Sequence, residues 1–189
     1  MVSGFGINDY EGVISDNGKE LKSYQTWRNM IARCYCDNTR KRYRTYSSCE
    51  VSCEWRYFSN FKKWFDENYI EGYDMDKDLI SPNNHLYSAE TCVFIPHRLN
   101  TLFRKLGRVK ECSMAGVAYY KKGVNKSYRA VFRANGGTKC IGGLKTEEDA
   151  HKLYVDAKKQ EVYRLANEYY SKGQIDEKVY NLVLNYIII

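Results

Sequence analysis

The sequence is poor in residues that break regular structure and in long apolar runs. Its 189 residues include only 2 prolines and 13 glycines, a composition that disfavours extensive disorder. No segment approaches the roughly 18 consecutive apolar residues of a membrane span. The first residues also lack the basic and apolar regions of a signal peptide. We therefore expect a cytoplasmic protein without a membrane anchor.

Cysteine and histidine are present but do not form a recognisable metal or disulfide framework. The seven cysteines are irregularly spaced, an odd count that disfavours paired disulfides. Cys34 and Cys36 form a C-x-C pair, and Cys49 and Cys53 form a C-x₃-C pair. None of the three histidines lies near either pair, so we expect no zinc site and reduced, mostly buried thiols.

Acidic residues are absent from a long basic stretch, although the whole chain carries a net charge of only +7. Residues 112–145 hold seven lysines and arginines and no acid, and residues 91–110 hold five more without an acid. So one-sided a distribution favours a polyanionic partner, and we expect double-stranded DNA. An ordinary solvated basic surface is the alternative.

Composition shifts near residues 107–113, and we predict two domains, residues 1–110 and 111–189. The first has helical apolar spacing in two places, with Ser23 as the cap of the earlier helix. The second has three alternating runs and then a capping-box pattern at Thr146. The predicted fold class is α+β. Its expected elements are helices at 23–34 and 58–69, a polar loop at 37–48, strands at 116–121, 127–133 and 138–144, and helices from 146 and over 176–188.

The stretch from residue 74 to residue 100 has the pattern of a compact ββα unit. Carboxylates alternate at Asp74, Asp76 and Asp78, a β-like run follows over residues 85–95, and the next helix carries Asn100. Bringing an acidic cluster against a helical amide creates oxygen ligands for one divalent cation, Mg²⁺ or Mn²⁺. No small-molecule cofactor is expected, and the sequence does not indicate an oligomeric state.

Residues 24–100 resemble the phage-encoded HNH-type, homing-like endonuclease family. The motifs that match are Y-x-x-W-x-x-M-x-x-R-C-Y from residue 24, V-x-C-E-W from 51, F-x-x-F-x-x-W from 58, M-D-K-D from 75 and Y-S-x-E-T-C from 87. The resemblance implies a ββα-metal module with Asp76 and Asn100 as metal ligands. It also places the family's catalytic histidine at Lys77 and the asparagine that orients it at Thr91.

Lys77 and Thr91 depart from the residues of that family, and these two differences leave two functions open. In the family the histidine is a general base, whereas a lysine is normally protonated at neutral pH and does not take up a proton. Lys77 can instead stabilise negative charge in a transition state, with Asp78, Glu90 or His97 as the substitute base. The chain is then either an endonuclease that hydrolyses DNA phosphodiesters or a catalytically degenerate DNA-binding protein, a regulator or a counter-defence factor. A module that binds an acidic protein is a third possibility.

Residues 114–157 resemble the Apetala/ethylene-response-factor-type DNA-binding domain. The matching motifs are A-G-V-x-Y from residue 115, Y-R-A-x-F-R from 128, I-G-G-L from 141 and T-x-E-x-A-x-x-x-Y from 146. The resemblance implies a three-stranded antiparallel sheet packed on a helix. Alternation along the second strand predicts one face against the helix and one face of guanidinium groups for the major groove. The candidate DNA contacts are Tyr120, Lys121, Tyr128, Arg129, Arg133 and Lys139.

A further basic and tyrosine-rich run lies at residues 40–46. Tyr43 and Tyr46 alternate there with four arginines and lysines. Contact with the DNA backbone and a solvated loop explain this run equally well.

Overall fold

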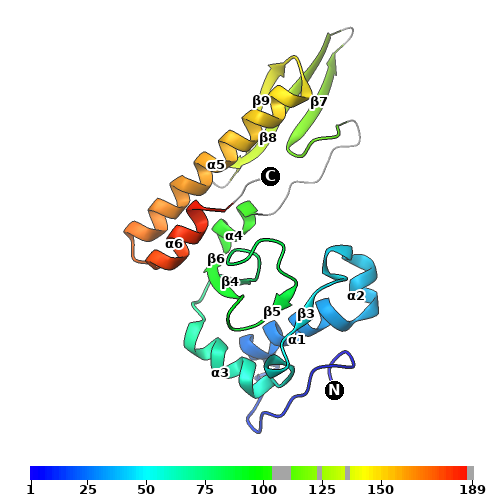
Figure 1. Ribbon diagram of the computed structural model, residues 1–189, viewed down its shortest axis with the longest axis vertical. Helices are drawn as coiled ribbons and strands as arrows, with labels where there is room; N and C mark the ends of the chain where they lie inside the picture. The colour runs from blue at the N-terminus through cyan, green and yellow to red at the C-terminus, as the bar shows by residue number, and fades with distance from the viewer. Residues whose placement is uncertain (104–111, 123–124, 135–136, 187–189) are drawn as a thin grey trace. The chain divides into compact units, whose positions relative to one another are not determined.

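The computed structural model describes residues 1–103, 112–122, 125–134 and 137–186, without the side chains of residues 121–126. Its elements make an α+β fold with several small sheets, which confirms the predicted class (Figure 1). The chain forms two compact units, Met1–Phe94 and Ile95–Ile189. The predicted domain boundary at residue 110 lies outside the described residues and stays a prediction.

Two amphipathic helices build the core of the first unit. They are α1 (Lys22–Tyr35) and α3 (Phe58–Asn68), close to the helices that apolar spacing predicts. Trp27, Phe58 and Phe61 are fully buried, and each such side chain contributes about 1.5–3 kcal/mol. The predicted cap at Ser23 is wrong: Leu21 occupies the N-cap, and Ser23 is buried within the first turn.

The predicted polar loop over residues 37–48 is also wrong. The chain forms a short helix, α2 (Asp37–Arg42), and a 3₁₀ turn, η1 (Arg44–Tyr46). Neither element contains a buried residue. The segment therefore lacks the apolar periodicity from which a helix is recognised in a sequence.

Three short strand pairings follow in the chain before the second unit's sheet. The hairpin of β1 (Ser15–Asp16) and β2 (Lys19–Glu20) precedes α1. Farther on, β3 (Glu50–Val51) pairs in parallel with β5 (Leu86–Tyr87), and a 3₁₀ turn, η2 (Glu54–Arg56), leads into α3. The last pairing joins β4 (Tyr73–Asp76) and β6 (Val93–Pro96).

The elements of this stretch run in the order β4, β5, β6 and α4 (His97–Phe103), and α4 belongs to the second unit, so the ββα module stays a prediction. The β-like run expected over residues 85–95 is not one strand. A turn at residues 88–91 interrupts it, and its two parts pair with different partners.

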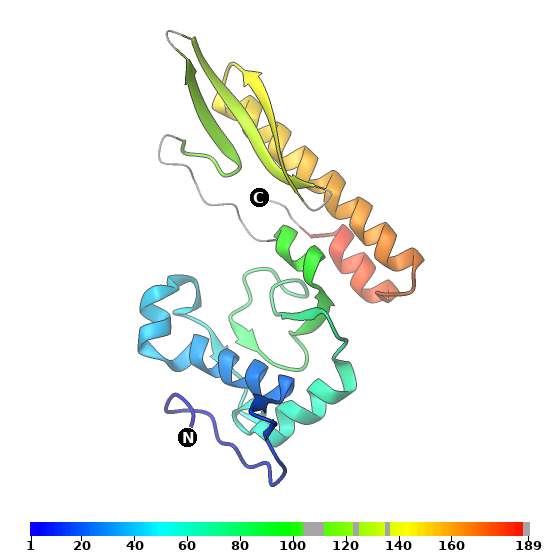
Figure 2. The ribbon, with the colours of Figure 1, turned by 180° about the vertical axis from the view of Figure 1, so that it is seen from behind.

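The second unit contains the predicted three-stranded sheet. Strands β7 (Val117–Lys122), β8 (Asn125–Ala134) and β9 (Gly137–Leu144) are antiparallel, with β8 in the centre. Helix α5 (Glu147–Ser171) runs along one face of this sheet (Figure 2). Within the described residues, no helix has both the length and the apolar character that a membrane crossing requires.

Local chemistry explains how α5 starts and how it meets the sheet. Thr146 caps α5 by accepting a hydrogen bond from the Asp149 amide at 3.1 Å, as its capping-box pattern predicts. Gly116 lies against the Tyr154 ring, where a Cβ atom would stand 2.2 Å from the ring carbon. Only glycine allows so close an approach of the strand entry to the helix.

The predicted final helix is α6 (Glu177–Leu184), which packs against α5. Asp176 caps it by accepting a hydrogen bond from the Val179 amide at 2.7 Å. Val179 and Val183 form its buried face. The end of the predicted helix, from residue 187, lies outside the described residues.

Candidate functional site

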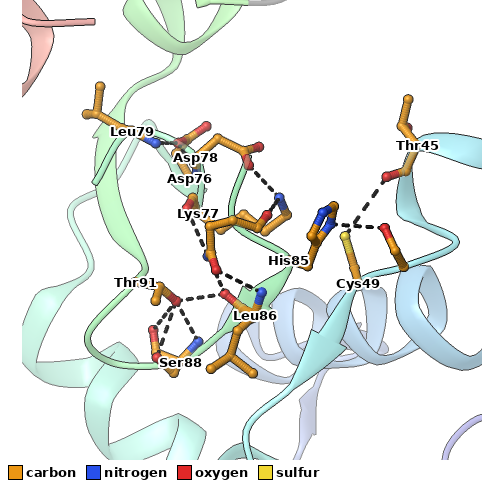
Figure 3. Close-up of polar contacts among 12 residues, drawn as sticks. Thr45, Cys49, Asp76, Lys77, Asp78, Leu79, His85, Leu86, Ser88 and Thr91 are labelled. Carbon is orange, nitrogen blue, oxygen red and sulfur yellow. Dashed lines mark hydrogen bonds and ion pairs between the residues drawn. The ribbon is translucent and has the colours of Figure 1, made fainter. Parts of the chain in front are cut away.

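Asp76, the predicted metal ligand, ends β4 and organises the turn after it. Its Oδ1 atom accepts hydrogen bonds from the amides of Asp78 at 2.9 Å and Leu79 at 2.7 Å (Figure 3). Burial raises the pKa of this carboxyl, although the Leu79 amide acts in the opposite direction. The two amides thus fix the orientation of the Asp76 carboxylate through Oδ1, and Oδ2 has no donor among the described residues.

Lys77, which the HNH resemblance places at a catalytic histidine, is a structural bridge. Its side chain is only 8% exposed. The ammonium group donates to Asp78 Oδ1 at 2.5 Å and to the Asn84 carbonyl at 2.6 Å, and it lies 5.7 Å from the centre of the Tyr87 ring. Two of its three hydrogens are thus used within the turn from residue 77 to residue 84 (Figure 3).

Thr91, which the HNH resemblance places at an orienting asparagine, closes the next turn. Its hydroxyl donates to the Leu86 carbonyl at 2.7 Å and accepts from the Ser88 amide at 3.1 Å (Figure 3). Thr91 thus makes local backbone contacts, and no hydrogen bond to Lys77 is found for it among the described residues.

Asn84 is an organising residue that the sequence did not single out. Its side-chain amide donates to the carbonyls of Lys77 at 3.2 Å and Leu86 at 2.6 Å, and its Oδ1 accepts from the Leu86 amide at 3.0 Å. The S-P-N-N run indicates a turn, but it does not reveal which asparagine folds back on the backbone.

The metal pair of Asp76 and Asn100 stays a prediction, because Asn100 lies on α4 in the second unit. A single carboxylate suits Mg²⁺ or Mn²⁺, which keep several water ligands. In the described part of the chain, no group of three or more His, Cys, Asp or Glu side chains is placed to hold a metal.

The candidate substitute bases differ in their surroundings. Asp78 is engaged with Lys77. A hydrogen bond from Ser88 lowers the pKa of Glu90, which makes that carboxylate a weaker base. His97 is exposed on α4, in the second unit.

The cysteine pairs considered for zinc lie in the first unit. Cys34 and Cys49 are buried, whereas Cys53 is exposed. Burial raises the pKa of the Cys34 thiol to about 12, and it also raises that of Cys49. Zinc binds thiolates, so this burial acts against metal binding at the two thiols.

The sheet of the second unit presents the candidate DNA-binding face. Ala130 and Phe132 are buried toward α5, whereas Arg129 and Arg133 alternate with them on the opposite face. This arrangement confirms the two faces that the sequence predicts for the central strand. We call the side away from α5 the outer face.

Arg129 is held flat at the centre of the outer face. Its guanidinium carbon lies 3.8 Å from the centre of the Tyr120 ring, a cation–π contact across β7 and β8. On its other side, Gly142 and Gly143 together oppose Arg129 in a β-bulge, and Gly143 has φ +85°. A Cβ atom at Gly142 would lie 3.1 Å from Arg129 Nε, so glycine leaves room for the guanidinium.

The remaining candidate contacts do not all share this face. Tyr120 and Arg133 are exposed on it. Tyr128 instead faces Tyr119, with ring centres 5.6 Å apart, and packs on the core. Lys139 pairs with Phe132 in register, so it lies on the face toward α5. The structure thus removes Tyr128 and Lys139 from the outer face, and the Lys121 side chain lies outside the described residues.

Comparisons with family models, with curated proteins and with solved structures found no match to this chain.

Proposed function

We propose that this chain is a DNA-binding protein whose outer face contacts double-stranded DNA. The observation that carries the proposal is the fixed position of Arg129 between Tyr120 and the Gly142–Gly143 bulge. Arg133 adds a second guanidinium group on the same face. Residues 112–145 contain no acid to oppose the negative charge of DNA.

The fixed position of Arg129 favours a defined hydrogen-bonded contact with DNA as well as electrostatic attraction to it. A guanidinium group that is already ordered loses less conformational entropy when it meets a base edge or a phosphate. Its planar donors suit either guanine O6 and N7 or two phosphate oxygens. A small antiparallel sheet can enter the wide major groove, which admits β-structure as well as helices.

Titration of labelled duplex DNA at several salt concentrations tests the proposal. We expect the affinity to fall as salt rises, because phosphate contacts release counterions. Arg129→Ala should weaken binding by about 1–3 kcal/mol. Lys152→Ala is the matched control, since it removes one exposed positive charge from α5, on the helix side of the sheet. Binding without salt dependence, or equal effects of the two substitutions, would overturn the proposal.

For the ββα segment we favour the catalytically degenerate alternative within the HNH-like class. The support is that Lys77 and Thr91 are engaged in the turns that follow β4 and β5. An ammonium group that bridges a carboxylate and a carbonyl does not activate water as a general base. In this alternative the segment supports the first unit without cutting DNA.

One observation favours the nuclease alternative: two backbone amides orient the Asp76 carboxylate and leave Oδ2 without a described donor. A divalent cation bound there would stabilise charge on the leaving oxygen. Incubation of supercoiled plasmid with Mg²⁺ or Mn²⁺ decides between the two. Nicking by the wild type that Asp76→Ala abolishes would establish the enzyme, whereas two equally inert proteins would support the degenerate alternative.

A further inference from the structure

The segment that carries α2 and η1 in the first unit is ordered although it buries none of its own residues. Short helices in proteins are normally stabilised by burying an apolar face. Core packing therefore does not explain why the sequence R-K-R-Y-R occupies residues 40–44. We call these five residues the basic patch.

The charge of the basic patch is not neutralised by neighbouring acids. Residues 38–49 contain four arginines and lysines and no acid. Lys41, Arg42 and Arg44 are exposed, and none of the ion pairs between described residues includes a member of the patch. A cluster of exposed cations without acidic partners attracts a polyanion.

The patch is also held in one conformation. Arg40 donates to the Ser47 carbonyl, and the Ser47 hydroxyl donates to the Arg44 carbonyl at 2.8 Å. Tyr46 packs against the core of the first unit, and the guanidinium carbon of Arg33 lies 5.5 Å from its ring centre. The backbone that carries these cations is therefore arranged before any partner arrives, which lowers the entropic cost of binding.

Tyr43 places an amphipathic ring among these cations. It is 48% exposed, and the Arg42 guanidinium carbon lies 5.4 Å from its ring centre. Its edge meets Tyr46, with the ring centres 6.5 Å apart. Tyrosine hydroxyls and arginine guanidinium groups are among the common donors to DNA phosphate oxygens.

We propose that the basic patch is a second DNA-binding surface, in the first unit, that contacts the phosphate backbone of double-stranded DNA. The inference rests on the proposed DNA-binding function but concerns residues other than the outer face. Phosphate contact without a base-reading element implies that this surface contributes affinity and no sequence preference.

Helix stabilisation is the competing explanation for part of the patch. Arg40, Lys41 and Arg42 form the last turn of α2, where positive charge is favourable to the helix dipole. That explanation does not cover Arg44, which follows the helix in η1, or the exposure of Tyr43. Arg44 is therefore the most informative single position.

The test compares the salt dependence of duplex binding for full-length variants. Lys41→Gln, Arg42→Gln and Arg44→Gln are combined in one protein. The matched control combines Lys19→Gln, Lys22→Gln and Lys63→Gln, three exposed lysines of the same unit. Both proteins lose three charges, so the comparison separates the patch from net charge. Arg44→Gln alone is a further variant, whose substitution lies outside α2.

If the patch contacts phosphates, its triple variant should reduce the slope of log affinity against log salt by about 2–3, while the control changes it little. Arg44→Gln alone should reduce the slope by about one. Equal slopes for the two triple variants would overturn the inference. If Arg129→Ala still weakens binding in that case, the proposed function stands without the patch. A wild type that does not bind DNA would overturn both.

Discussion

At the scale of single residues, Lys77 has a structural role at the position where the HNH resemblance would place a catalytic histidine. Its ammonium group bridges Asp78 and Asn84 while its stem is nearly inaccessible to solvent. The contact with Asp78 joins neighbours in the sequence. The contact with Asn84 joins residues seven positions apart through a turn, and no local pattern predicts it.

Removing the ammonium group should destabilise the first unit. We expect Lys77→Met to cost about 1–3 kcal/mol in the free energy of unfolding, because the Asn84 carbonyl then loses a charged donor. Methionine retains an apolar stem, so most of the packing is kept. Urea denaturation measures the change, with Lys63→Met on the exposed surface of α3 as the control. Equal stability of the two variants would contradict the bridging role.

Asp9 provides a pH-dependent cap for α3 from a distant part of the chain. It accepts hydrogen bonds from the Ser59 amide at 2.9 Å and the Ser59 hydroxyl at 2.6 Å. Desolvation acts to raise the pKa of Asp9, but the hydrogen bonds from Ser59 outweigh it and lower the pKa. A carboxyl whose pKa is lowered on folding stabilises the protein above its unfolded pKa and loses that contribution as the pH falls.

We therefore expect Asp9→Ala to cost about 0.5–1 kcal/mol near pH 7, typical of a lost helix cap at an exposed site. The difference from wild type should begin to shrink below about pH 4, the ordinary aspartate pKa of the unfolded chain, and should vanish below the lowered pKa of folded Asp9. Thermal unfolding at a series of pH values measures it. Glu11→Ala, at an exposed position nearby, should show little difference at any pH. A constant Asp9→Ala effect across this range would contradict the mechanism.

At the scale of elements, periodic apolar residues made α1, α3 and the three strands of the sheet predictable. Segments without buried residues were not predictable in this way, and α2 is the clearest case. The prediction of one β-like run over residues 85–95 was wrong for another reason, because polar contacts of Thr91 and Ser88 close a turn inside it. The face on which Lys139 lies was not predictable, because it depends on the register of β9, which the sequence does not reveal.

The bulge in β9 leads to a test of the outer face. Gly142→Ala should displace the Arg129 guanidinium, because the added Cβ atom would lie 3.1 Å from Nε. We expect a loss of DNA affinity of about 1 kcal/mol, which should not exceed the loss caused by Arg129→Ala. Gly137→Ala is the control in the same strand, since its Cβ atom would meet nothing closer than 4.0 Å. Anisotropy titrations that gave both variants wild-type affinity would remove Arg129 from the proposed contact.

At the scale of the whole molecule, each unit offers its own candidate contact with DNA: the outer face in the second unit and the basic patch in the first. Linking two weak contacts in one chain raises the effective concentration of the second once the first is bound. This benefit does not require that the ββα segment cut DNA. It also explains why a chain of modest net charge carries its basic residues in separate, acid-free stretches.

The most direct measurement is the alkylation rate of Cys140 with and without duplex DNA. Cys140 is an exposed thiol that pairs in register with Val131, between Arg129 and Arg133 on the outer face. Peptide mass spectrometry after iodoacetamide treatment follows this thiol separately from Cys53, the exposed thiol of the first unit. If DNA lies on the outer face, saturating duplex should slow alkylation of Cys140 several-fold, and Arg129→Ala should weaken that protection at limiting DNA. An unchanged Cys140 rate in a protein that has bound DNA would contradict the proposed interface.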